Sequence, residues 1–458
     1  EPSAAVSPDG RRVAISAGGS TSRLAVFDRT GKELWSAPLP AHPRPARWST
    51  DGRLVACATE AEVTICDAAT GRALQRLPAP DGAGEFLGPI GFDLAGNRLT
   101  AVLDDGRKVA TFSLGPDARV TVSEIPEGGA TDVSPDGRTA ACVNGSPTVA
   151  LFDVPAGRFR VGWTLPAQGR GKSPLGFCPT PNVAWFRPDG TGLFSWTGDG
   201  TLLLWNPETG EPQGVIETGL GAISSWALSP DGLWLAAAQA EEVSLWEVPT
   251  GKFLATRELP HGYPLTGLAF LGPGRLLTTS SDHTALLWDV APRNKPPGPL
   301  WDALNGDDGR AANQAAWALA ADPRGPDILR TRLSPAQPAP AERLNRWLAH
   351  LGSDDYGLRE TATRELRDLG RLVEPELRAA RDKATSEEVR TRLDRLLIQV
   401  PRMRTPEEWV QARAVLAMEV AGTEAAKKVL GEWAAGAAGA RLTIDAKAAL
   451  GRLAAVRP

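Results

Sequence analysis

The sequence predicts seven four-stranded antiparallel β-units that form a β-propeller, followed by an α-helical domain. The first observation behind this prediction is a repeated corner motif. Its closing glycine recurs at intervals of 41 to 44 residues, with one interval of 53. The second is the strand pattern between the corners, and the third is a change of composition after residue 292. A repeat of about 40 residues is typical of propellers with four strands per blade.

Each corner has the composition of a tight turn between two strands. The motif is Ser-Pro-Asp-Gly or a close variant, in which Asp bonds the local backbone and Gly adopts the turn geometry. The corners occupy residues 7–10, 49–52, 93–96, 134–137, 187–190, 229–232 and 271–274. Because the same residue types recur at the same turn positions, we expect the Ser and Asp residues to serve the scaffold and not catalysis.

Further features recur between the corners. A strand of small residues follows each corner, and the next strand ends in an aromatic and a polar residue, as in Phe27-Asp28, Trp246-Glu247 and Trp288-Asp289. A Thr-Gly or Ala-Gly turn then leads to a strand that usually ends in Leu-Pro or Ile-Pro. Four short strands separated by such turns make one antiparallel blade.

On these residues the units resemble WD40 repeats, and seven of them imply a seven-bladed propeller. The seventh unit is the most similar to the family pattern. In that family a His, a Ser or Thr, an Asp and a Trp form a hydrogen-bonded tetrad that ties adjacent loops and strands together. The resemblance places this structural tetrad at His261, Ser280, Asp282 and Trp288.

A composition change marks the predicted domain boundary, where the strand pattern gives way to a chain rich in Ala, Leu, Arg and Glu. We expect a propeller over residues 1–292, a Pro-rich linker over 293–299 and an α-helical repeat domain over 300–458. Apolar residues at helical spacing predict antiparallel helix pairs similar to HEAT repeats. Capping boxes at Thr385 and Thr405, and a stop at Gly422, mark helix ends.

The helical tail carries a second resemblance. Residues 301–308, 358–366 and 439–443 are similar to the tail of WD40-repeat proteins abundant in planctomycete bacteria, in which propeller and tail often follow another module. The chain starts at Glu1 inside a repeat, so we expect the natural N-terminus to lie upstream. A signal or anchor there would decide the cellular compartment, for which we favour the cytoplasm. Without an upstream strand, the seventh blade would expose an edge.

Few residues suit catalysis or metal binding. The 4 His show no metal spacing, and the 4 Cys form no CxxC motif and are expected as buried free thiols. Gly171-Lys172-Ser173 lacks the upstream glycine of a phosphate-binding loop, since position 166 is Pro. We predict that the chain is not an enzyme and holds no cofactor or metal.

Charge and hydropathy disfavour nucleic-acid binding and a membrane span. Residues 1–300 hold 25 Lys and Arg against 31 Asp and Glu, and residues 301–458 hold 25 against 23. DNA-binding proteins concentrate basic charge on one face. The near-equal numbers of basic and acidic residues here do not predict such a face. No apolar run reaches the roughly 18 residues of a transmembrane helix.

We therefore predict a non-catalytic interaction or sensing scaffold that binds a protein or peptide through the loop face of the propeller. The 53-residue interval enlarges the connection between the fourth and fifth blades, where Arg170, Lys172 and Phe177 are the expected partner contacts. Two alternatives stay open: a coat-like, membrane-associated propeller with an α-solenoid, and an enzyme with a pocket in the propeller channel. The partner and the oligomeric state are not predicted.

Overall fold

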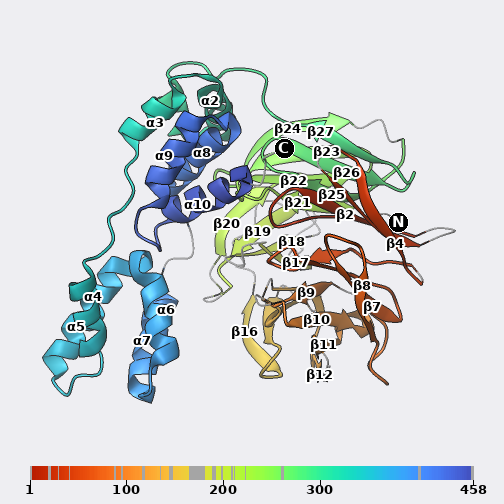
Figure 1. The fold of residues 1–458 in the computed structure, drawn as a ribbon, viewed down its shortest axis with the longest axis horizontal. Coiled ribbons are helices and arrows are strands. Elements are labelled where there is room, and N and C mark those ends of the chain that lie inside the picture. The colour runs from red at the N-terminus through yellow and green to blue at the C-terminus, as the bar shows by residue number, and fades with distance from the viewer. Residues whose placement is uncertain are drawn as a thin grey trace. The chain divides into compact units, whose positions relative to one another are not determined.

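Two compact units make up the chain, Glu1–Ala291 and Pro292–Pro458. The first consists of β-strands and the second of α-helices (Figure 1). The computed structural model describes residues 3–18, 22–28, 30–40, 42–86, 89–93, 96–115, 119–134, 136–143, 148–164, 181–187, 192–197, 200–207, 210, 212–221, 223–258, 262–400 and 404–454.

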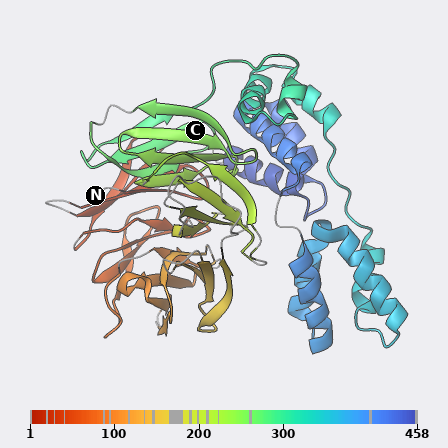
Figure 2. The same ribbon diagram turned by 180° about the vertical axis from the view of Figure 1, so that it is seen from behind.

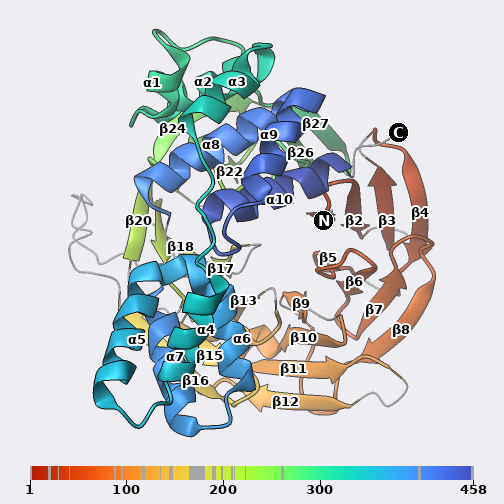
Figure 3. The ribbon, with the colours of Figure 1, turned by 60° about the vertical axis from the view of Figure 1, so that its left-hand side comes forward.

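The first unit is a seven-bladed β-propeller, which confirms the predicted fold class (Figure 3). In blades one to six, four antiparallel strands follow one another in chain order. The first strands of neighbouring blades contact one another, so they are the inner strands of the ring. Blades one to three comprise β1 (Ser3–Val6), β2 (Arg12–Ala17), β3 (Arg23–Asp28), β4 (Glu33–Pro38), β5 (Arg47–Trp48), β6 (Leu54–Ala58), β7 (Glu62–Asp67), β8 (Ala73–Pro78), β9 (Ile90–Phe92), β10 (Arg98–Leu103), β11 (Lys108–Ser113) and β12 (Val120–Glu124). Blades four to seven comprise β13 (Gly129–Val133), β14 (Thr139–Val143), β15 (Thr148–Asp153), β16 (Arg158–Thr164), β17 (Pro181–Phe186), β18 (Leu193–Thr197), β19 (Thr201–Trp205), β20 (Pro212–Glu217), β21 (Ser225–Leu228), β22 (Trp234–Gln239), β23 (Glu242–Glu247), β24 (Lys252–Glu258), β25 (Leu265–Phe270), β26 (Arg275–Ser280) and β27 (Ala285–Asp289).

The outer strand of most blades carries a β-bulge opposite the aromatic end of the third strand. In blade one, Val26 faces Trp35 and Phe27 faces Glu33, so Leu34 is the extra residue. The same shift recurs in blades two, four, five and six. Bulges twist an edge strand and oppose edge-to-edge pairing with another chain.

The ring closes between blades seven and one through their inner strands. Gly267 on β25 lies so close to β1 that a Cβ there would come within 3.4 Å of the backbone nitrogen of Ala4. Ala269 and Leu277 pack with Val13 in the same contact region. Within the described residues blade seven has three strands, and β27 is its edge, with Leu287 43% exposed.

The second unit is helical, as predicted. Its elements are α1 (Leu300–Leu304), α2 (Gly309–Ala321), α3 (Gly325–Arg332), α4 (Ala341–His350), α5 (Tyr356–Leu369), α6 (Glu374–Lys383), α7 (Glu387–Gln399), α8 (Pro406–Ala421), α9 (Glu424–Ala434) and α10 (Arg441–Ala454). The capping box of Thr405 with Glu408 and the left-handed Gly422 are confirmed at the ends of α8. The N-cap of α7 is Ser386 and not Thr385, because the Ser386 hydroxyl is the group that accepts the Val389 N–H.

Packing in the helical unit is not purely sequential. The helix α2 packs against α8, and α8, α9 and α10 pack against one another. The helices α4 to α7 lie between them in sequence and share a separate apolar cluster around Leu366 and Leu393. Figure 2 shows the green-teal helices from the start of this unit beside the deep blue helices from its end. Similarity to HEAT repeats therefore stays a prediction.

Two buried charged side chains of α8 connect this helix to α10 and to the end of α1. Glu419 on α8, which is 6% exposed, accepts two hydrogen bonds of 2.6 and 2.7 Å from the guanidinium of Arg452 on α10. Arg413, also on α8, donates to the carbonyl oxygens of Leu304 and Gly306 and so satisfies the end of α1. Such pairs fix the helix arrangement, because a buried charge without its partner is costly.

Candidate functional site on the propeller

The corners use their polar side chains internally, as predicted. In the four Ser-Xaa-Asp-Gly corners the Ser hydroxyl donates to the Asp carboxylate at 2.5 to 2.7 Å. The same carboxylate accepts a backbone N–H two residues further on, as Asp231 does from Leu233. The closing glycines have φ between 68° and 71°, a region that favours glycine. Ser and Asp at these corners are therefore scaffold.

The turns between third and fourth strands follow the same principle. The Asp28 carboxylate accepts the backbone N–H and the hydroxyl of Thr30, and Asp67 does the same with Thr70. These bonds, chiefly the threonine hydroxyl in each case, lower the pKa of Asp28 and Asp67. Both carboxylates are accordingly held in the charged form by their own turn.

Asp132 departs from the expectation that the Asp residues belong to turns. It lies on the inner strand β13, is 6% exposed, and accepts the backbone N–H of Phe186 on β17 at 2.8 Å. Arg47 on β5 reaches it at 3.4 Å from blade two. Burial raises the pKa of Asp132, although Arg47 and the Phe186 N–H both favour the charged form. Sequence spacing gave no signal for this pair, because it depends on how blades two, four and five meet at the centre of the ring.

Three inner-strand tryptophans pack between neighbouring blades. The ring of Trp185 is 2% exposed and stacks on Trp226 with centroids 4.0 Å apart. Trp48 donates its indole N–H to the Ala5 carbonyl at 3.0 Å, and the Arg12 guanidinium lies 4.9 Å from its ring. These contacts tie blade five to six and blade one to two.

The predicted tetrad is described in part, because His261 lies outside the described residues. The Trp288 indole donates to the Thr278 hydroxyl at 2.8 Å and not to Ser280. Trp288 faces Leu276 in the strand register, so Thr278 is its diagonal neighbour. Ser280 lies two residues further along β26, beyond the reach of this diagonal contact. The Ser280 hydroxyl instead donates to the Pro264 carbonyl at 3.2 Å. The complete tetrad stays a prediction.

Asp282 closes the turn between β26 and β27. Its carboxylate accepts the backbone N–H and the hydroxyl of Thr284 at 2.8 and 2.7 Å. Blade five repeats the tryptophan contact, since Trp205 donates to the Ser195 hydroxyl at 2.8 Å. The spacing of ten residues between the hydroxyl and the Trp is the signal that would have identified Thr278.

The strand topology divides the propeller loops between two ends. Successive strands are antiparallel, so the corners and the turns between third and fourth strands share one end, here called the corner end. The turns between second and third strands and the connections between blades share the other, here called the loop end. The predicted partner contacts Arg170, Lys172 and Phe177 fall in the connection between blades four and five, outside the described residues, and stay a prediction.

Acidic side chains are exposed at the loop end. Glu85 lies in the connection between blades two and three, Glu127 in the next connection, and Glu241 in the turn of blade six. These exposed carboxylates are suited to contact with a basic partner.

The described residues contain no cluster of metal ligands. No group of three or more His, Cys, Asp or Glu in that part of the chain is placed to hold a metal ion. Nor does any described helix have the length and apolar character needed to cross a membrane. The described cysteines, Cys57, Cys66 and Cys142, are buried free thiols.

Comparison with known proteins supports the fold and one repeat. The WD40 family profile, described as WD domain, G-beta repeat, matches residues 250–289. Guanine nucleotide-binding protein subunit beta-1 of Drosophila melanogaster is 29% identical over 106 residues, which are 22% of this chain and 31% of that protein. Protein ANTHESIS POMOTING FACTOR 1 of Arabidopsis thaliana is 28% identical over 128 residues, or 28% of this chain and 36% of that protein. The chain thus spans about a third of the length of these curated relatives.

A solved structure extends the likeness to the whole propeller. The β-propeller domain of Myceliophteria thermophila Cps50 (Swd1) has a TM-score of 0.52 and 12% identity, and covers 63% of this chain and 96% of that one. At this identity the likeness concerns the fold alone. The class of protein is therefore a seven-bladed propeller, with a WD40 repeat match that runs from the outer strand of blade six through blade seven, and a helical C-terminal unit. The resemblance of the tail to planctomycete proteins stays a prediction.

Proposed function

We propose that this chain is a non-catalytic protein-interaction scaffold that binds a protein or peptide at the loop end of the propeller. The observation that carries this proposal is the difference between the polar side chains of the corners and three exposed carboxylates at the loop end. At the corner end, Ser and Asp are engaged in their own turns. At the loop end, the exposed carboxylates of Glu85, Glu127 and Glu241 sit on connections held by the rigid blades.

The relatives agree with this proposal in kind. The name of the Drosophila relative describes a subunit, which is a part of an assembly. Partner contact through Arg170, Lys172 and Phe177 belongs to the same proposal, because β16 ends and β17 begins at the loop end on either side of these residues. A HEAT-like helical unit would add a second binding surface.

Affinity capture with matched charge reversals tests the proposal. The full chain and the variants Glu241→Lys at the loop end and Lys252→Glu at the corner end would be used to capture proteins from the source extract. Quantitative mass spectrometry should show a set of proteins lost with the loop-end variant and kept with the corner-end variant. Equal capture by both variants would place binding elsewhere, and turnover of a small molecule dependent on a channel residue would favour an enzyme.

A further inference from the structure

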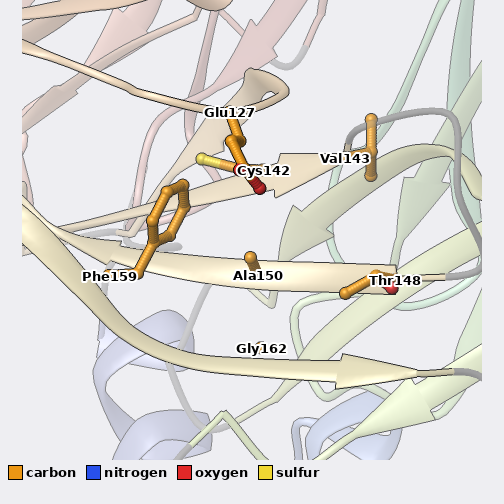
Figure 4. Close-up of a pocket in the computed structure, with 7 residues that line it drawn as sticks. All are labelled: Glu127, Cys142, Val143, Thr148, Ala150, Phe159 and Gly162. Atoms are coloured by element: carbon orange, nitrogen blue, oxygen red, sulfur yellow. The ribbon is translucent and has the colours of Figure 1, made fainter.

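A cavity of about 210 Å³ opens on the face of blade four that is turned toward blade three. It is lined by side chains of β14, β15 and β16, and by Glu127 from the connection between blades three and four (Figure 4). Figure 4 shows Glu127 pointing from this connection toward Cys142, with the ring of Phe159 beside them. Because Val143 ends β14 and Thr148 begins β15, the cavity reaches the loop end.

Small residues in register create this cavity. Cys142 faces Ala150 and Ala150 faces Gly162 across three neighbouring strands. The corresponding positions of the next blade hold larger side chains, the buried Leu203 and the exposed Val215. A Cβ added at Gly162 would meet nothing nearer than 3.8 Å, so the floor of the cavity has room.

The size of the cavity indicates a single side chain as its occupant. Sites for drug-sized ligands and cofactors measure roughly 300–1,000 Å³, which exceeds the volume available here. The walls are mainly apolar and include the aromatic ring of Phe159. A long aliphatic stem would therefore bury apolar surface against Ala150 and Phe159.

The charge of the cavity indicates a cationic head on that side chain. Glu127 is the acidic group of the lining, is exposed at the rim, and makes no ion pair with the described residues. Cys142 adds no charge, because burial raises the pKa of its thiol to about 12. The residues 1–300 as a whole carry more Asp and Glu than Lys and Arg, a net charge that favours the approach of a basic partner.

We propose that this cavity receives the Arg or Lys side chain of a partner peptide, with the stem between Ala150 and Phe159 and the cationic head on Glu127. The inference rests on the proposed function and deepens it, since it names the anchor of the partner at the loop end. Arg fits best, because its planar guanidinium can bond a carboxylate and stack on an aromatic ring.

A displayed library of random peptides, selected on the full-length chain, supplies the probe. Enriched peptides would be synthesised with a fluorophore, and their affinities measured by fluorescence anisotropy. We expect them to share an Arg or Lys. Replacing an anchor Arg by citrulline, which removes the charge and keeps the shape, should weaken binding by about threefold to tenfold.

Two cavity variants and two matched controls locate the contact. Glu127→Gln should weaken the Arg peptide by about threefold to tenfold and leave the citrulline peptide unchanged, which is the signature of direct coupling. Gly162→Val, which introduces the residue of blade five, should weaken both peptides by about tenfold or more. Glu124→Gln and Gly214→Val change a carboxylate and a glycine on outer strands outside the cavity, and should have no effect.

The outcomes separate this inference from the proposed function. Peptides that bind every variant equally would overturn the cavity inference and leave the scaffold proposal standing. Sensitivity to Gly162→Val without sensitivity to Glu127→Gln would mean an apolar anchor and would overturn the cationic one. Failure to enrich any peptide would count against both. Thermal unfolding of each variant verifies that the fold is kept, and Glu127, at the exposed rim, is expected to tolerate Gln.

Discussion

Replacing Asp132 tests whether this buried carboxylate is a structural acceptor between blades four and five. Asp132→Ala removes the acceptor of the Phe186 N–H, which the structure shows at 2.8 Å. A buried amide left without its partner costs about 1–3 kcal/mol, equivalent to roughly fivefold to 150-fold in a local opening equilibrium. Asp132→Asn keeps an acceptor oxygen in place and should cost less than about 1 kcal/mol, because the fold does not favour the charged form of this group.

Hydrogen exchange measured by mass spectrometry reads this difference at the peptide that contains Phe186. Exchange there should accelerate in Asp132→Ala and stay near the wild-type rate in Asp132→Asn. The pKa of Asp132 is raised in the folded state, so its contribution to stability is present at low pH and is lost as the pH rises through that raised pKa. Wild type should therefore gain stability relative to Asp132→Asn as the pH falls from neutral. If Asn accelerated exchange as much as Ala, the ion pair with Arg47 would be the important contact and this reasoning would be refuted.

Three further substitutions test other contacts, each followed by urea unfolding. Ser229→Ala removes the hydroxyl that donates to Asp231 and accepts the backbone N–H of Trp234 at 2.9 Å. The free energy of unfolding should therefore fall by about 1–2 kcal/mol. Thr278→Val takes away the acceptor of the Trp288 indole and should cost about 1 kcal/mol; Ser280→Ala should leave that indole bonded, as the exchange of its N–H measured by NMR would show. Arg452→Ala removes the guanidinium that donates two hydrogen bonds to the buried Glu419 and should destabilise the helical unit by about 3–5 kcal/mol, whereas a loss below about 1 kcal/mol would contradict the importance of this ion pair.

The sequence predicted the propeller because its signals are local. A corner such as Ser229 to Gly232 contains its own hydrogen bonds, so the residue types alone reveal the turn. The helix signals at Thr405 and Gly422 are local in the same sense and were confirmed. The hydroxyl that accepts the Trp288 indole is Thr278 and was not predicted, because its choice depends on the strand register opposite Trp288.

Non-local contacts account for what the sequence did not predict. Asp132 has the residue type of a turn but lies on β13, where its partners come from two other blades. The helix α8 packs on α2, a contact between distant segments that local capping and periodicity signals do not predict. The cavity beside Glu127 requires the register of Ala150 with Gly162 and the bulge that follows it, so it became visible only with the sheet assembled.

The most direct test of the scaffold proposal is the hydrogen-exchange footprint of an enriched peptide on the full-length chain. The account predicts slower exchange at the loop end, in the connections around Glu85 and Glu127 and the turn at Glu241. It also predicts unchanged exchange at the corners, such as residues 229–232. Protection at the corner end, or at the helical unit alone, would contradict the proposal that partners bind at the loop end of the propeller.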